Sequence, residues 1–125
     1  MRVLDVFTAA CAILSQTVED SEELAVLTPA WLGVLMRECL PNENMLRRQE
    51  GKEELTALPL VASGMDTAPL PFHEEIAGTA MVYGLAAFFF LDDENTYMHN
   101  YYRSLYVQAL GEMTRAEDGV VADLY

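Results

Sequence analysis

Residues 76–91 constrain the fold more than any other feature, because this stretch of 16 residues contains no charged side chain. It is shorter than the roughly 20 residues that a helix needs to cross a bilayer, which favours burial inside a protein. Two glutamates precede it, at positions 74 and 75, and they are typical of a helix start. The pattern therefore predicts a helix over residues 74–91 that is apolar nearly all round. Such a helix must be covered on every side, so the rest of the chain is expected to surround it.

Three further segments have the periodicity of amphipathic helices. Apolar residues recur every three or four positions over residues 2–16, from residue 22 to Leu40, and after an acidic turn at 92–94 to about residue 113. Pro41 and Asn42 are expected to interrupt the second of these helices, with a short helical continuation over residues 43–52. The patterns together predict an all-α fold, a small bundle of about four helices.

The segment before the apolar stretch has a different character. Residues 54–72 include Pro59, Gly64, Pro69 and Pro71, a density that favours extended segments and turns over a helix. We expect a long Pro-rich central loop or a short hairpin here, within a bundle domain of residues 1–113. Loops of this length in a small domain usually serve a function or contact a partner.

Residues 114–125 are acidic, contain a glycine and end in apolar side chains. They are too few to predict another helix, so we expect an extended C-terminal tail that follows the bundle domain. Such a tail either docks on a neighbouring molecule or frays in solvent, and the sequence leaves both open.

The charge balance disfavours two classes of partner. The chain has 20 Asp and Glu against 7 Lys and Arg, a formal net charge of −13. Nucleic-acid phosphates and anionic membrane surfaces both require clustered cations, so neither is an expected partner. Asp5 interrupts the apolar N-terminal run, and no convincing cleavage pattern follows it, so we expect no signal peptide and synthesis in the cytoplasm.

No pattern indicates catalysis, a cofactor or a metal site. His73 begins the order of a zinc motif, but position 77 is Ala77 where a second histidine would be needed. His99 is expected on a solvated helix face. Cys11 and Cys39 match neither a metal knuckle nor a disulfide framework and are expected to be buried. The glycines form no phosphate-binding loop, and carboxylate pairs at helix starts are explained by capping. We therefore expect no enzyme, with no catalytic residue and no cofactor.

Arg47, Arg48 and Lys52 form the one basic cluster of the sequence. One interpretation is a solvated helix end, where cations favour the negative end of the helix dipole. The other is a contact with an acidic neighbour, including another copy of this same chain. The sequence leaves both interpretations open.

The order of elements over residues 58–110 resembles that of the head–tail connector, or adaptor, proteins of tailed bacteriophages. Four features carry the resemblance: a loop with leucine and proline, a helix with the phrase Tyr-Gly-Leu-Ala-Ala at 83–87, an acidic turn, and a helix with spaced aromatic residues. The first predicted helix and the acidic linker after it also fit the start of that family.

The resemblance implies a structural virion protein at the neck, made in the host cytoplasm and without enzymatic activity. Such subunits form a homo-oligomeric ring, commonly of twelve copies, beneath the portal protein, and attach tail or stopper proteins. The DNA passes through the ring without sequence-specific binding, and no membrane is involved. The residues then expected to contact neighbouring copies, portal or tail proteins are Arg47, Arg48, Leu58, Leu60, Pro69, Pro71, Val120, Val121, Leu124 and Tyr125.

An alternative hypothesis is an acidic interaction or inhibitor protein that binds a basic protein surface. The net charge of −13 is the feature that favours it. Tight, salt-sensitive binding to a basic target would distinguish it from a ring subunit.

Overall fold

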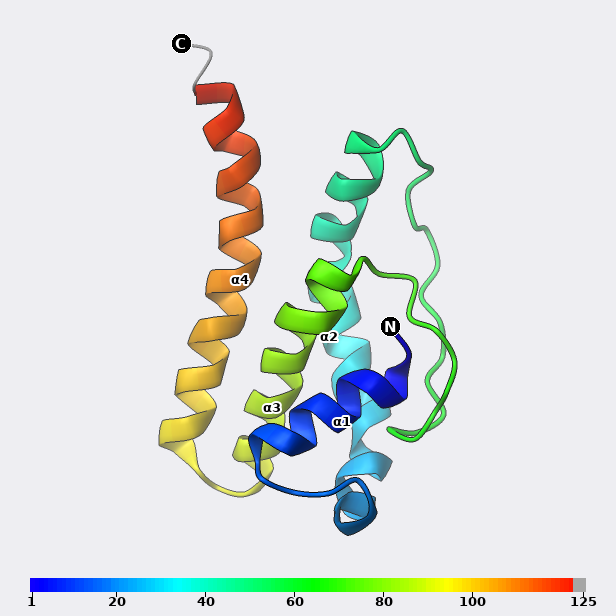
Figure 1. Cartoon of the computed structure of the whole chain (residues 1–125), viewed down its shortest axis with the longest axis vertical. Helices are drawn as coiled ribbons and strands as arrows, with labels where there is room; N and C mark the ends of the chain where they lie inside the picture. Colours follow the sequence, from blue (N-terminus) through cyan, green and yellow to red (C-terminus); the bar gives the residue numbers. More distant parts are fainter. Residues whose placement is uncertain (123–125) are drawn as a thin grey trace.

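The computed structural model describes the backbone of residues 1–122 and the side chains of residues 1–113. Four helices make up most of it, and within the described residues there is no strand, only an isolated bridge between Arg2 and Pro69 (Figure 1). The predicted all-α bundle of about four helices is thus confirmed. The elements are α1 (Val3–Ile13), a 3₁₀ turn η1 (Glu19–Ser21), α2 (Glu22–Gln49), a π-helical turn η2 (Ile76–Ala80), α3 (Met81–Asp92) and α4 (Thr96–Ala122).

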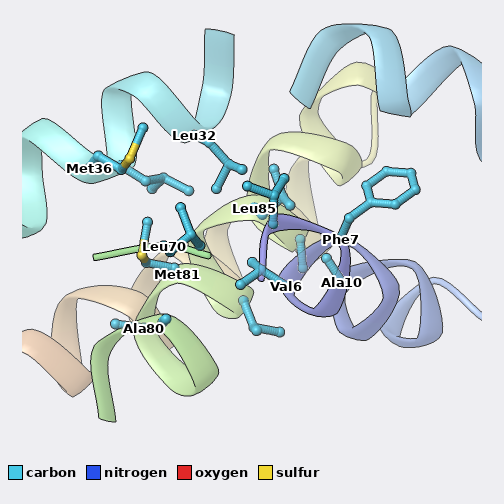
Figure 2. Packing of buried hydrophobic residues seen from close by; sticks show 14 of the residues in the cluster. Val6, Phe7, Ala10, Leu32, Met36, Leu70, Ala80, Met81 and Leu85 are labelled. Carbon is cyan, nitrogen blue, oxygen red and sulfur yellow. The ribbon is translucent and has the colours of Figure 1, made fainter. Parts of the chain in front are cut away.

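Helix α3 lies at the centre of the bundle and packs against α1, α2 and α4. Figure 2 shows apolar side chains from α1, α2, α3 and the chain before η2 converging around Leu85, which is 0% exposed. Full burial of a side chain of this size stabilises a fold by about 1.5–3 kcal/mol. The apolar stretch is therefore covered by the other helices, as its sequence predicts. The residues labelled in Figure 2 are Val6, Phe7, Ala10, Leu32, Met36, Leu70, Ala80, Met81 and Leu85.

Gly84 allows α2 and α3 to approach closely. A Cβ atom at this position would lie 2.5 Å from Leu35 Cδ2 and 3.1 Å from a ring carbon of Tyr106. Any larger residue at this position would force the buried Leu35 side chain to move.

The predicted interruption at Pro41 is wrong, because α2 continues through it to Gln49. Proline removes one backbone hydrogen bond, which costs about 3 kcal/mol in a helix interior. Side chains on both sides of Pro41 are buried in the bundle, Cys39 before it and Glu43 and Met45 after it. Tertiary packing of α2 therefore outweighs the local preference.

The predicted extended tail is also wrong for residues 114–122, because α4 continues through them to Ala122. A single glycine costs a helix only about 1 kcal/mol, and Gly119 is the only one in this stretch. Val120 and Val121 lie on this last part of α4, which extends past the start of η2 in Figure 1. Leu124 and Tyr125 lie outside the described residues.

By length and mean hydropathy alone, the helical segment 19–49 would be able to cross a membrane. The core helices of helical bundles pass the same test. In this fold 33% of the most apolar 18-residue window of this segment is buried, and Leu32 and Leu35 belong to the central apolar cluster.

Candidate interaction surface

Residues 50–73, here called the anchored loop, link α2 to the helical turn before η2 and run along α2 on the side away from α4 (Figure 1). A loop without regular structure must satisfy its backbone polar groups by other means. Four sets of contacts do this, and each fixes a different part of the loop.

Asn44 on α2 makes the first contact. Its Oδ1 accepts a hydrogen bond from the backbone N–H of Leu55 at 2.7 Å, and its Nδ2 donates to the Leu55 carbonyl at 3.2 Å. One amide side chain thus replaces the two hydrogen bonds that a neighbouring strand would supply. Leu58 and Val61, further along, pack against the core.

Gly64 makes the second contact. Its N–H donates to the Ala25 carbonyl at 2.9 Å, and a Cβ here would lie 2.7 Å from the Phe7 ring. The loop backbone is therefore pressed directly onto α1 and α2. Asp66 holds the following turn, since its carboxylate accepts from the N–H groups of Ala62 and Ala68, and these bonds lower the pKa of Asp66.

The third contact joins the loop to the start of α1. The first N–H groups of a helix have no partner within it. Here Val3 donates to the Ala68 carbonyl at 3.1 Å and Leu4 donates to the Asp66 carbonyl at 2.9 Å. The anchored loop thus caps α1.

The fourth contact is a buried polar cluster around Glu43, whose side chain is 1% exposed. Its carboxylate accepts from the His73 backbone N–H at 2.7 Å and from Arg47 Nε at 2.5 Å, and lies 3.0 Å from His73 Nδ1. His73 Nε2 faces the Glu50 carboxylate on the other side. Arg47 also donates to the Pro71 carbonyl at 3.0 Å. The cluster fixes the end of the loop to the C-terminal part of α2.

The pKa values in this cluster follow from its contacts. Burial alone would raise the pKa of Glu43, but hydrogen bonds from His73 and Arg47 outweigh it and lower that pKa. The hydrogen bond with Glu43 raises the pKa of His73, against its partial burial, and Glu50 raises it further. Because the Glu43 carboxylate is buried, it depends on these partners to stay charged. Among the described residues, no group of three or more His, Cys, Asp and Glu is placed to hold a metal ion.

The residues expected at an interface differ in their surroundings. Leu60 is 99% exposed, whereas Leu58 is half-buried against the core. Pro69 is exposed beside Arg2, and Pro71 contributes its carbonyl to Arg47. The four loop residues belong to the anchored loop but have different surroundings, while Val120 and Val121 lie on the last part of α4.

The two arginines of the basic cluster have partners within the chain. Arg47 contacts Glu43 and two loop carbonyls, and Arg48 forms an exposed ion pair with Glu54 at 2.6 Å. An exposed pair of this kind contributes little to stability. Arg47 therefore has a role in holding the loop, and the sequence had offered no reason to expect it. Glu43, the centre of the cluster, was not predicted either, although it lies four positions after the buried Cys39.

A second surface feature is an acidic hollow of about 470 Å³ where the α1–η1 linker meets the α3–α4 turn. Phe89 and Leu14 form part of its lining. The remaining lining is dominated by carboxylates, namely Glu19, Asp20, Glu22, Glu23, Asp92 and Asp93. The hollow is therefore strongly negative.

Comparison with known proteins gives no relative from which a function could be transferred: no family model, curated protein or solved structure matches this chain.

Proposed function

We propose that this chain is a structural virion protein, a head–tail connector subunit that forms a ring beneath the portal, extends the DNA channel and attaches the tail. The observation that carries the proposal is the anchored loop, which presents Leu60 at 99% exposure from a backbone fixed on both sides of it. The order of elements over residues 58–110 resembles that of the head–tail connector family and is the reason for proposing this class of protein.

Leu60 is held in water by a backbone that is fixed on both sides of it. An exposed leucine on a mobile loop would need no explanation, because scattered surface apolar residues are common. Leu60 differs in that Leu55 and Gly64 are both hydrogen-bonded to α2, so the segment between them has little freedom left to lose on binding. Such preorganisation is what an assembly contact requires.

The net charge of −13 supports a channel role. A wall that attracted phosphates would retain the DNA that has to pass, whereas a negative wall leaves it mobile. The proposed partners are further copies of this chain, twelve in the ring, together with portal and tail or stopper proteins. The proposed location is the virion neck, and the proposed role involves no enzymatic activity and no membrane.

The test is co-expression of the tagged chain with the portal protein encoded in the same genome, followed by affinity purification and negative-stain imaging. We expect a ring-shaped complex that contains portal protein. Leu60→Asp should lower portal recovery at least about tenfold, a loss of roughly 1.4 kcal/mol. Val26→Asp is the matched control, because Val26 is a 75% exposed apolar residue on α2. The proposal is wrong if no portal protein is recovered.

A truncated chain that ends at Met113 tests the remaining interface residues. It removes the last part of α4 with Val120 and Val121, as well as Leu124 and Tyr125. We expect the helical signal of the bundle to persist and ring assembly to fail. Normal assembly of the truncated chain would remove these four residues from the proposed interface.

The acidic hollow favours a second candidate function, an acidic protein that binds a basic protein surface. Six carboxylates around one hollow would attract a lysine- or arginine-rich partner and make its binding strongly dependent on salt. Recovery of a basic cellular protein instead of portal protein, with binding lost in Asp92→Asn/Asp93→Asn, would support this candidate over the ring.

A further inference from the structure

The outward face of α2 is apolar and largely uncovered. The core covers only 33% of the most apolar 18-residue window in segment 19–49. Val26 is 75% exposed and Leu27 is 40% exposed. The anchored loop and α4 flank α2 on its two sides (Figure 1), and neither covers these side chains. Residues spaced three or four positions apart form this face, here called the α2 face: Glu23, Val26, Leu27, Ala30, Gly33, Val34, Arg37 and Pro41.

The two charged residues of the α2 face have no ionic partner in their own chain. Of the Lys and Arg side chains that the structure describes, five form ion pairs and exposed Arg37 forms none. Glu23, exposed at the other end of the face, forms no ion pair with a described residue either. An unpaired arginine is unexpected in a chain with 20 acidic residues, so this face has an unused cation and an unused anion.

Polar side chains beside the face, on the flank towards α4, are held by internal contacts. Arg103 pairs with Glu38 at 3.3 Å. His99 Nδ1 lies 2.7 Å from the Ala87 carbonyl, and the side chain is half-buried, where the sequence had predicted a solvated histidine. The charges that the α2 face itself offers to a partner are therefore those of Glu23 and Arg37.

The positions of these two charges make the face complementary to itself. Glu23 and Arg37 are 14 positions apart, and Ala30 lies midway between them. A two-fold axis beside Ala30 would place Arg37 of one copy opposite Glu23 of an antiparallel second copy, and Glu23 opposite Arg37. One such contact forms two ion pairs. An apolar partner without a matching carboxylate would instead leave Arg37 covered and unpaired, which is costly. Charge complementarity thus favours a second copy as the occupant.

The antiparallel orientation also keeps the acidic ends of the two copies apart. Glu23 borders the acidic hollow that Asp92 and Asp93 help to line. At a rise of 1.5 Å per residue, the two Glu23 positions would be about 21 Å apart along the helices, beyond the screening length of about 8 Å. A parallel pair would bring the hollows together. Each hollow instead approaches the second half of the other α2, where residues 30–49 contain three arginines and two glutamates.

We propose that the free chain forms a two-fold dimer in which the α2 faces of two copies pack antiparallel, with Arg37 of each copy paired to Glu23 of the other. The small side chains of Ala30 and Gly33 at the centre of the face allow the two helices to approach closely. The same surface is used on both copies, so the contact closes on itself and does not extend into a ring. The inference therefore goes beyond the proposed connector role and does not depend on it.

Sedimentation equilibrium of the purified chain without portal protein tests the proposal, at concentrations up to about 1 mM. The wild-type chain should form dimers. Arg37→Glu and Glu23→Arg each place like charges opposite each other, and each should weaken dimerisation at least about tenfold. Glu23→Arg is the sharper of the two variants. It lowers the net negative charge of the chain, so a general repulsion between copies would predict stronger association instead.

Restoring opposite charges should restore the dimer. An equimolar mixture of the Arg37→Glu and Glu23→Arg chains can form a heterodimer in which both pairs again have opposite charges. The double variant Arg37→Glu/Glu23→Arg recreates both pairs in a homodimer. We expect the mixture and the double variant each to dimerise within about threefold of the wild type.

Two further variants define the surface. Ala30→Glu, at an exposed helix position, would bring two carboxylates together at the two-fold axis and should prevent dimerisation. Glu112→Arg makes the same change of charge as Glu23→Arg but lies exposed on α4, so it should dimerise at least as well as the wild type. Circular dichroism of each variant verifies that the helical fold is retained.

Three results would overturn the inference: a wild-type chain that stays monomeric at about 1 mM, a Glu23→Arg chain that dimerises like the wild type, or a mixture in which dimerisation is not restored. None of these depends on portal binding, so the dimer and the connector role can fail separately. Val26→Asp distinguishes them further, because Val26 lies on the α2 face. This variant should weaken dimerisation and leave portal recovery unchanged.

Discussion

The central helices and the anchored loop are held together by different kinds of interaction. Around α3 the apolar side chains of several elements share the stabilisation, and no single contact defines the packing. The loop between α2 and η2 is held by a few polar groups, above all Glu43 and Asn44, each of which makes more than one hydrogen bond. The core is therefore expected to lose stability in proportion to the volume removed, whereas a change of one polar group is expected to release the part of the loop that it holds.

The largest effect is expected in the core. Leu85→Ala removes a side chain that is 0% exposed and leaves a cavity between α1, α2 and α3. We expect the free energy of unfolding to fall by about 2–5 kcal/mol. Urea denaturation followed by circular dichroism measures this loss. An unchanged unfolding midpoint would contradict the central place of α3.

Glu43→Gln is expected to give the next largest effect, and a more local one. The amide keeps the shape but loses the charge that accepts from Arg47 and His73. We expect a loss of about 1.5–3 kcal/mol, because hydrogen bonds to charged groups contribute that much. Amide hydrogen exchange should accelerate at His73, whose N–H donates to Glu43, before it accelerates in α3. Glu54→Gln, an exposed loop carboxylate, is the control. Uniform acceleration through α3 would show that loop and core are not separate.

The pH dependence should distinguish the two regions further. His73 has a pKa above its ordinary value of 6.5. Its contribution to the free energy of unfolding is therefore complete below pH 6.5 and is lost as the pH rises through the pKa of the folded state. Glu43 has a pKa below its ordinary value of 4.5. Its contribution to the free energy of unfolding is therefore complete above pH 4.5 and is lost as the pH falls through the pKa of the folded state. The cluster should therefore stabilise the fold most between pH 4.5 and pH 6.5. Arg47, Glu50 and Lys52 are the other charged groups beside it.

The measurement is urea denaturation across a pH series for the wild type and for His73→Gln. The variant should lack the loss of stability on the alkaline side and retain the loss on the acid side. Identical profiles would contradict a role for His73 in holding the loop.

The smallest effect on stability is expected at Leu60. Leu60→Asp should change the free energy of unfolding by no more than about 0.5 kcal/mol, as is usual at exposed sites. Leu58→Asp, two positions earlier, places a charge against the core and should be clearly destabilising. Urea denaturation of the pair distinguishes a projecting side chain from a packed one. A large loss in Leu60→Asp would mean that the leucine supports the fold.

The helical part of the fold could be predicted from the sequence because periodicity is a local signal. The stretch 76–91 indicated a covered central helix, and α3 is that helix together with η2. The interruption at Pro41 was predicted wrongly, since a local rule contains no information about the packing on both sides of α2. The end of α4 was predicted wrongly because residues 114–125 are too few for a separate helix, whereas α4 continues through Gly119 to Ala122.

The polar anchors of the loop could not be predicted in this way. Glu43 and His73 are 30 positions apart, and the path of a loop between them follows no period. The available signal of a polar anchor was Glu43 itself, a carboxylate on the buried stripe of α2, four positions after Cys39. It indicates that a partner is needed but does not say which residue supplies it.

The capping of α1 by the loop sets an order for folding during synthesis. Helix α1 leaves the ribosome before the loop that caps it, because the acceptors for its first amides belong to Asp66 and Ala68. With only 11 residues, it is too short to be stable alone in water. Its apolar face, with Val6 and Phe7, therefore stays uncovered until the loop and α3 have been synthesised. Helix α1 is thus completed well after it is made, and the nascent chain is exposed to aggregation during that interval.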